Sequence, residues 1–264
     1  MRHLVVGWML LAVAMAPGTP PPRQDLNPIE EVMLDMAPNS FDDQYRGCSR
    51  LMEKKLRDLN RTEFANNSVY AQAWAAATIE WRNRRGHVPV PPRLRPEQAV
   101  AIMAYTAPVP LHRTFNRAVR QAGRSLQDYM DNFHFKVLHF LLTQALSTLR
   151  DAWPRRCHQV YRGVQGVLFT ARRGDTVRFG HFTSTSLHRD STTAFGQDTF
   201  FSVWTCYGIA IRNFSFFPME EEILIPPFEM FKVTGVTREG DKATIKLESQ
   251  DVHSEHNCEF LKGE

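Results

Sequence analysis

Residues 219–229 read MEEEILIPPFE, in which three acids stand directly before an apolar run that two prolines close. The β-branched residues of that run favour a strand, and side chains alternate between the two faces of a strand. The pattern predicts that Glu220 and Glu222 point the same way, about 6.6 Å apart, while Glu221 points opposite. Like charges this close oppose each other's ionisation, so the pair suits a cationic or proton-donating ligand. A solvated acidic turn before a core strand is the alternative interpretation.

Two segments upstream offer complementary groups. In residues 159–164 (QVYRGV), alternation places Arg162 on the same face as two valines. A buried guanidinium needs an anion, although an arginine at a strand end can instead extend to water. In residues 182–187 (FTSTSL), Ser184 and Ser186 share a face, so their hydroxyls could orient a carboxylate.

Arg162, then Ser184 in Ser-Thr-Ser, then Glu222 in Glu-x-Glu resemble, in this order, the R-S-E signature of the arginine-specific mono-ADP-ribosyltransferases. The flanking letters agree: YRG at 161–163, RFGHFTSTSL at 178–187 and FSFFP at 214–218. The likeness covers nearly everything between Cys48 and Cys258, and the extracellular (ecto) branch of the family is the nearest. Each motif alone is weakly specific, whereas the three in order with their flanks are strongly so.

The resemblance implies an enzyme that moves ADP-ribose from NAD, or from NADP, to arginine side chains of acceptor proteins and releases nicotinamide. It implies that Glu222 stabilises the positive charge that develops on the ribose, as carboxylates do in glycosidases. Ser184 would hold Glu222, and Tyr105, Arg162 and Ser184 would contact NAD, with the planar guanidinium suited to phosphate. Glu220 would pair with the acceptor guanidinium and take its proton. NAD is then a consumed substrate, and no cofactor is expected.

Two other functions remain open from the sequence. One is an NAD glycohydrolase in which water replaces the acceptor, and the presence of Glu220 disfavours it. The other is a catalytically silent secreted binding module of the same fold, which we would expect to lack Arg162 or Glu222.

The chain carries a net charge of +4. No module of stacking aromatic residues accompanies that charge, so no nucleic-acid partner is expected.

Residues 1–18 combine a short basic start, an apolar run and small residues, as is typical of a secretory signal peptide. The run is shorter than the roughly 20 apolar residues of a transmembrane helix, so no membrane span is expected. The tail at 259–264 is polar and lacks the apolar stretch of a glycolipid-anchor signal. We therefore expect a monomer that is secreted or held in the secretory lumen.

The chain has four cysteines, an even number that fits the oxidising export route. The sequence by itself allows three pairings, and the resemblance implies Cys48 with Cys258 and Cys157 with Cys206. Metal ligation is disfavoured because no Cys-x-x-Cys occurs, so no metal site is expected.

Three glycosylation sequons begin at Asn60, Asn66 and Asn213. Asn213 lies just before the acids, on a segment that we expect to face inward. The first two are therefore the better candidates.

We predict an α+β fold in which an N-terminal helical part packs on a two-sheet β core of the ADP-ribosyltransferase type. Residues 19–40 are Pro-rich and predict little order, and residues 41–258 form one catalytic domain with a helical half (41–154) and a β half (155–250). Periodicity predicts helices over 41–61, 69–82, 96–105, 111–121 and 131–149. It predicts strands over 158–164, 176–187, 199–205, 207–212, 222–226, 228–237 and 242–249, with a short helix over 190–195.

Overall fold

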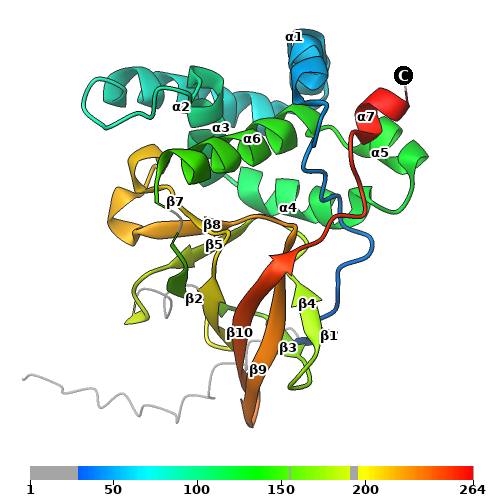
Figure 1. The fold of residues 1–264 in the computed structure, drawn as a ribbon, viewed down its shortest axis with the longest axis vertical. Coiled ribbons are helices and arrows are strands. Elements are labelled where there is room, and N and C mark those ends of the chain that lie inside the picture. Colours follow the sequence, from blue (N-terminus) through cyan, green and yellow to red (C-terminus); the bar gives the residue numbers. More distant parts are fainter. Residues whose placement is uncertain (1–28, 155, 191–195, 264) are drawn as a thin grey trace, which may run out of the picture.

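The computed structural model describes residues 29–154, 156–190 and 196–263. The expected signal peptide therefore lies outside the described residues, as does nearly all of the helix expected over 190–195. Helices gather at one end of the molecule and strands at the other, which is the predicted α+β arrangement (Figure 1).

The helical part consists of α1 (Ser49–Asn66), α2 (Ser68–Arg84), α3 (Pro96–Thr106), α4 (Leu111–Ala122), α5 (Leu126–Asn132) and α6 (Lys136–Ala152). The β part consists of β1 (Glu30–Met33), β2 (His158–Val164), β3 (Val167–Thr170), β4 (Thr176–Arg178), β5 (Thr183–Ser186), β6 (Thr199–Thr205), β7 (Ile209–Ala210), β8 (Glu222–Ile225), β9 (Glu229–Glu239) and β10 (Lys242–Val252). Two short 3-10 turns, η2 (Arg212–Phe214) and η3 (Pro218–Glu220), precede β8, and α7 (Glu259–Lys262) follows β10.

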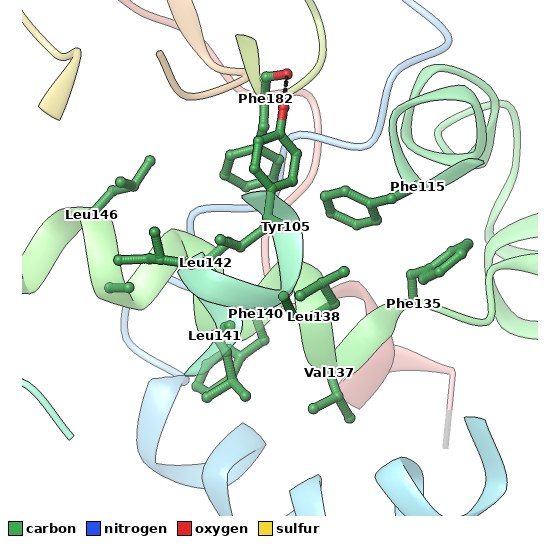
Figure 2. Close-up of a cluster of buried hydrophobic side chains, with 14 of the residues drawn as sticks. Tyr105, Phe115, Phe135, Val137, Leu138, Phe140, Leu141, Leu142, Leu146 and Phe182 are labelled. Atoms are coloured by element: carbon green, nitrogen blue, oxygen red, sulfur yellow. Dashed lines mark hydrogen bonds between the residues drawn. The ribbon is translucent and has the colours of Figure 1, made fainter. Parts of the chain in front are cut away.

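Helix α6 lies at the centre of the helical core. The apolar stripe that begins at Phe135 is buried along its length, and α3 packs against it with every side chain from Gln98 to Thr106 buried (Figure 2). Fully burying one such large apolar side chain stabilises the fold by roughly 1.5–3 kcal/mol. The stripe therefore serves packing of the helical core.

One large sheet runs in the order β4-β9-β10-β6-β2-β5-β8-β7. Its two sections meet at β2 and β5, which share a single residue pair, Tyr161 with Ser186. Apolar side chains from both sections, including Val160, Phe201 and Ile223, fill a second core separate from the helical one. The break between β2 and β5 gives the β part its two-section form and brings β2 beside β5 and β8.

Several helix boundaries differ from the sequence prediction. The first helix begins at Ser49 rather than at residue 41, because residues 41–48 form an irregular segment with a left-handed residue at Tyr45 and at Gly47. The helix expected over 131–149 is two helices, α5 and α6. The Glu63 carboxylate accepts the backbone N–H groups of Lys136 and Val137 at the start of α6, a contact across 73 residues that periodicity cannot show.

Strand boundaries also differ. The segment expected as one strand over 176–187 is two strands, separated around Gly180, whose φ is +66° and whose added Cβ would lie 2.3 Å from the Ala37 Cβ. The strand expected over 207–212 is only the two residues of β7, followed by η2. Residues 30–33, expected to have little order, form β1 and pair in parallel with β3, which was also not predicted. Both strands are four residues long and lie outside the large sheet.

Local capping and turn residues mark several of the observed boundaries. The Asn67 side chain accepts the N–H of Tyr70 and so caps α2, Gly123 ends α4, and Gly240 with φ +61° turns the chain between β9 and β10. No helix in the described part of the chain is long and apolar enough to cross a membrane. Within the same residues, no cluster of three or more His, Cys, Asp or Glu side chains could hold a metal ion.

The three sequons differ in accessibility. Asn66 is exposed at the end of α1, whereas Asn60 is half-buried and its side-chain oxygen accepts the Tyr70 hydroxyl at 3.2 Å. Asn213 is half-buried in η2, and the Ser215 of its sequon is fully buried. Asn66 is therefore the most accessible of the three.

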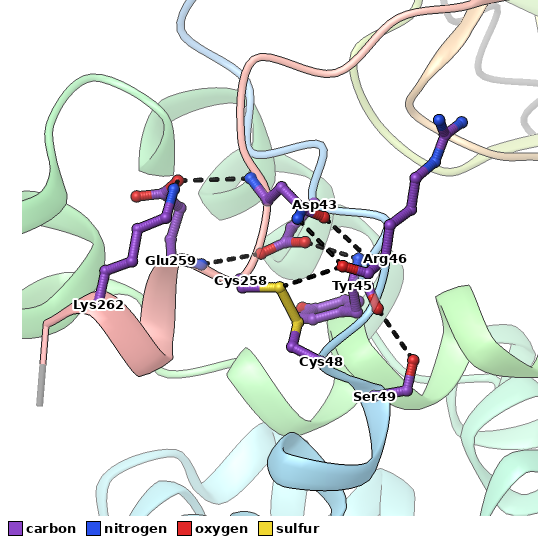
Figure 3. Close-up of a disulfide and its surroundings, with 9 residues drawn as sticks. Asp43, Tyr45, Arg46, Cys48, Ser49, Cys258, Glu259 and Lys262 are labelled. Carbon is purple, nitrogen blue, oxygen red and sulfur yellow. Dashed lines mark hydrogen bonds and ion pairs between the residues drawn. A yellow bond between two sulfur atoms is a disulfide. The ribbon is translucent and has the colours of Figure 1, made fainter.

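Two disulfides join Cys48 to Cys258 and Cys157 to Cys206, the pairings that the resemblance implies. The first closes a loop of 210 residues and ties the start of α1 to the chain just before α7 (Figure 3). Around it, the Asp43 carboxylate accepts the backbone N–H groups of Tyr45 and Glu259. These contacts fasten the segment just before α1 to the C-terminal end of the described chain.

Replacing both Cys48 and Cys258 by serine should lower the free energy of unfolding by about 2–5 kcal/mol, because the unfolded chain regains the entropy of a long open loop. Denaturant unfolding of the purified variant measures this loss. The double replacement avoids a free thiol. Unchanged stability would show that the hydrogen bonds around Asp43 hold the two ends without the disulfide.

Candidate active site

Three adjacent strands bring the R-S-E residues together. Arg162 lies on β2, Ser184 on β5 and Glu222 at the start of β8, and β5 pairs with both of the other strands. The Arg162 Nη1 donates a hydrogen bond to the Ser184 carbonyl at 2.7 Å. Residues 60 positions apart in the chain thus meet in one cluster because the two sections of the sheet join here.

The Glu222 carboxyl is buried, with 5% of its surface exposed. Burial, and then the neighbouring Glu220, raise the pKa of this carboxyl to about 7. Hydrogen bonds from Ser184 and Ser215 and the charge of Arg162 act in the opposite direction. The Ser215 Oγ donates to the Glu222 Oε2 at 3.4 Å. Because the carboxyl titrates near neutrality, modest changes around it decide whether it is charged.

Arg162 is half-buried, and burial lowers its pKa, while the nearby Tyr105 and Glu222 raise it. The Arg162 guanidinium thus lies near enough to the Glu222 carboxyl for the charge of that carboxyl to raise its pKa. An arginine held this way keeps further N–H donors for a ligand, since its fork carries five.

Tyr105 lies beneath the cluster. It is 2% exposed, and its hydroxyl donates to the Phe182 carbonyl at 2.9 Å (Figure 2). Asn116 donates to the same carbonyl and to the Tyr105 hydroxyl. The Ser184 side chain hydrogen-bonds with both Tyr105 and Glu222. Ser184 is therefore fixed from below by Tyr105 while it contacts the carboxylate.

The expectation that Glu220 and Glu222 share one strand face is wrong. Glu220 lies in the 3-10 turn η3, Glu221 is left-handed with φ +44° and ψ +52°, and the strand begins only at Glu222. Pro218 opens that turn, and alternation does not apply to a turn. The two acids are close all the same, since Glu220 raises the pKa of Glu222. Glu221 does point elsewhere, toward His188 and Arg212.

Sequence reasoning missed several residues around the cluster. Ser215 and His181 stand in the sequence only inside flanking motifs, and Asn116 lies in no motif. Burial, and then Arg120 and Arg162, lower the pKa of His181 to about 3, so this ring is neutral at physiological pH. Asn116 could have been found as a polar residue at a position of α4 that faces the core. Ser215 could have been found from its place inside the motif FSFFP.

Positive side chains border the cluster on the α4 side. Arg113, Arg117 and Arg120 are exposed on that helix. Partial burial is the largest cause that lowers the pKa of Arg120, and the charges of Arg117 and Arg162 lower it further. Such a rim attracts anionic ligands. An anionic ligand can therefore bind at Arg162. The buried Glu222 carboxyl nearby can then stabilise a positive charge that develops on that ligand.

This fold and this cluster define a chain of the ADP-ribosyltransferase class. A family model described as NAD:arginine ADP-ribosyltransferase matches residues 34–255, and the chain belongs to that family. It is 50% identical over 260 residues to the erythroblast NAD(P)(+)–arginine ADP-ribosyltransferase of Gallus gallus, covering 98% of this chain and 86% of the relative. It is 48% identical to the human GPI-linked NAD(P)(+)–arginine ADP-ribosyltransferase 1, covering 99% and 84%.

Solved structures agree with the fold. The crystal structure of the eukaryotic mono-ADP-ribosyltransferase ART2.2 has a TM-score of 0.76 and 37% identity, covering 86% of this chain and 98% of that one. A mutant of the same protein in complex with NAD has a TM-score of 0.75 and 36% identity over the same shares. These matches place both the helical and the β part in one known architecture.

Proposed function

We propose that this chain transfers ADP-ribose from NAD, or from NADP, to arginine side chains of proteins. The observation that carries the proposal is the contact of Arg162, Ser184 and Glu222 on adjacent strands, with Glu220 on the turn just before them. Family membership supports it, as do relatives that are named NAD(P)(+)–arginine ADP-ribosyltransferases. In this proposal NAD is a substrate that the reaction consumes.

In the proposed reaction the bond between nicotinamide and the ribose C1′ breaks, and nicotinamide leaves with the electron pair. A guanidinium nitrogen of the acceptor then bonds to C1′ and releases one proton. Glu222 faces the positive charge that develops on the sugar, where a preorganised carboxylate lowers the barrier. Arg162 binds the NAD diphosphate or ribose. Ser184 keeps Glu222 in place, and Tyr105 supports Ser184 and forms part of the NAD contact.

Glu220 serves the acceptor in this proposal. A guanidinium is charged at ordinary pH and is a poor nucleophile. The Glu220 carboxylate pairs with it, directs one nitrogen toward C1′ and takes the released proton. Glu220 is half-buried on its turn, whereas Glu222 is buried behind it, so the two acids meet the bound molecules at different depths.

Incubating the purified protein with labelled NAD, with and without the arginine analogue agmatine, tests the proposal. We expect nicotinamide release in both samples and labelled agmatine in the second. Nicotinamide release with no labelled agmatine would favour an NAD glycohydrolase. No reaction in either sample would favour a silent binding module.

The rate of NAD cleavage should rise with pH as Glu222 loses its proton, with an apparent midpoint near the pKa of about 7 of that carboxyl. The sign follows from the charge, because only the carboxylate can stabilise a positive sugar. Nicotinamide release is measured from pH 5 to 9 at NAD concentrations well below KM, where the rate reports the ionisation of the free enzyme. A rate that is already constant from pH 5 would show that Glu222 is ionised throughout.

We also propose that the chain works in an oxidising, extracytosolic compartment. Two disulfides in the described chain support this, because such bonds persist outside the reducing cytosol. Two of the relatives, from mouse and human, are named GPI-linked. Fractionation of cells that express the full chain, followed by thiol labelling of the four cysteines, tests the compartment.

A further inference from the structure

Glu221, the middle acid of the three, has no part in the proposed reaction and yet is strongly constrained. It is a residue with a Cβ in the left-handed conformation, at φ +44° and ψ +52°, which costs energy for any residue other than glycine. This residue is the only link between Glu220 in η3 and Glu222 in β8. Its conformation therefore sets the direction of the Glu220 side chain relative to the strand.

Two basic side chains from separate elements hold the Glu221 side chain. The His188 Nε2 lies 2.8 Å from one carboxylate oxygen, and the Arg212 Nη1 lies 3.0 Å from the other. His188 follows β5, the strand of Ser184, and Arg212 begins η2. Glu221 is thus attached both to the strand that carries the catalytic serine and to the segment that leads into the acids.

The same turn is held through its backbone. The Ser186 Oγ donates to the Glu220 carbonyl at 3.0 Å, and the His188 N–H donates to the Ser186 Oγ at 3.0 Å. The Leu187 N–H donates to the Glu221 carbonyl at 3.4 Å. Residues 186–188 therefore hold Glu220 and Glu221 from one side, while Arg212 holds Glu221 from the other.

Glu222 depends much less on these contacts. It is held by Ser184, by Ser215 and by the ladder between β5 and β8. Loss of the Glu221 ion pairs frees the turn that carries Glu220 before it disturbs the strand that carries Glu222.

We propose that Glu221 is a positioning residue for Glu220, and that its ion pairs to His188 and Arg212 favour arginine transfer over NAD cleavage by water. This inference rests on the proposed function. A carboxylate that must guide one guanidinium nitrogen to C1′ tolerates little displacement, since a shift of about 1 Å can cost on the order of 100-fold in rate. The ion pairs are partly exposed and individually weak. Their effect is to hold a direction rather than to add stability.

The main test is Glu221→Gln, which keeps the size of the side chain and removes its charge. We expect the ratio of labelled agmatine to released nicotinamide to fall about tenfold. His188→Ala and Arg212→Ala should each lower the ratio by a smaller factor. In the double variant of Glu221→Gln and Arg212→Ala, the ratio should fall no further than in Glu221→Gln alone, because the same ion pair is lost. The matched control is Glu31→Gln, which removes an exposed ion pair to Arg238 and should leave the ratio unchanged.

A second variant separates the side chain from the backbone. Glu221→Gly relieves the left-handed strain and still removes both ion pairs. We expect its ratio to fall at least as far as that of Glu221→Gln. A Gly variant with the wild-type ratio would show that the backbone conformation is sufficient, and it would overturn the inference.

Salt gives a readout that a purely structural role would not change. Between 0.1 M and 1 M salt the screening length shortens from about 10 Å to about 3 Å, which weakens partly exposed ion pairs. The wild-type ratio should fall with salt more steeply than that of Glu221→Gln. Equal salt dependence in the two proteins, or a parallel loss of transfer and cleavage in the variant, would overturn the inference. A wild-type protein without either activity would instead contradict the proposed function.

Discussion

The Glu222→Gln variant is expected to lose both NAD cleavage and arginine transfer by about 100- to 1000-fold, the usual cost of losing one well-placed electrostatic stabiliser. The amide keeps the shape of the side chain but cannot face the positive sugar with a negative charge. Both reactions share that step, so both should fall together. Nicotinamide release and labelling of agmatine, measured on one purified sample, give the two rates.

The stability of the same variant provides the control for folding. In the wild type the Glu222 pKa is about 7, above its ordinary value of 4.5. The folded protein therefore binds this proton more tightly than the unfolded chain, and the resulting stability is lost as pH rises from 4.5 through about 7. A glutamine at position 222 does not titrate, so the variant does not lose this stability as the pH rises. The thermal midpoint of Glu222→Gln minus that of the wild type should therefore be larger at pH 8 than at pH 5. Near-normal turnover in a folded Glu222→Gln variant would show that another acid serves the sugar.

The three motif residues could be predicted from sequence because each is marked by its immediate neighbours. Arg162 alternates with valines on β2, Ser184 lies in Ser-Thr-Ser, and Glu222 begins an apolar strand. Their order in the chain does not by itself place β2, β5 and β8 side by side. The pairing of β5 with both β2 and β8 in the structure places them there.

What the sequence did not show depends on contacts between distant segments. The start of α6 is set by Glu63, and the pairing of β1 with β3 joins residues more than 130 positions apart. The gap between β4 and β5 is set by the approach of Ala37 to Gly180. These contacts leave only a weak pattern in the local sequence. A prediction based on periodicity therefore continues a helix or strand past the residue where it ends in the structure.

The site itself was mispredicted at one point, the turn at Glu220. Strict alternation was applied to MEEE as if the strand already began at Met219, although Pro218 and a left-handed Glu221 keep Glu220 in η3. The proposed division of roles between the two acids therefore rests on a different geometry. Glu222 is fixed in the sheet beneath the site, and Glu220 is carried on a turn whose direction the ion pairs of Glu221 define.

The Glu220→Gln variant is expected to lose arginine transfer by about 100-fold or more while it continues to cleave NAD with water as the acceptor. In the proposed reaction the Glu220 carboxylate pairs with the guanidinium and takes its proton, and a water acceptor depends less on either interaction. Loss of the nearby charge also removes one cause of the raised pKa of Glu222. The pH midpoint for NAD cleavage should therefore move downward in this variant.

The measurement compares nicotinamide release with labelled agmatine for wild type, Glu220→Gln and a charge-matched control, Glu248→Gln. Glu248 is exposed on β10, which β6, β2 and β5 separate from β8, so its loss should change neither rate. A residue that only supported the fold would lower both activities in proportion to the amount of folded protein. Parallel loss in Glu220→Gln would therefore contradict the division of labour, and so would retained transfer to agmatine. Selective loss of transfer, with a lower pH midpoint for cleavage, would assign the acceptor to Glu220 and the sugar to Glu222.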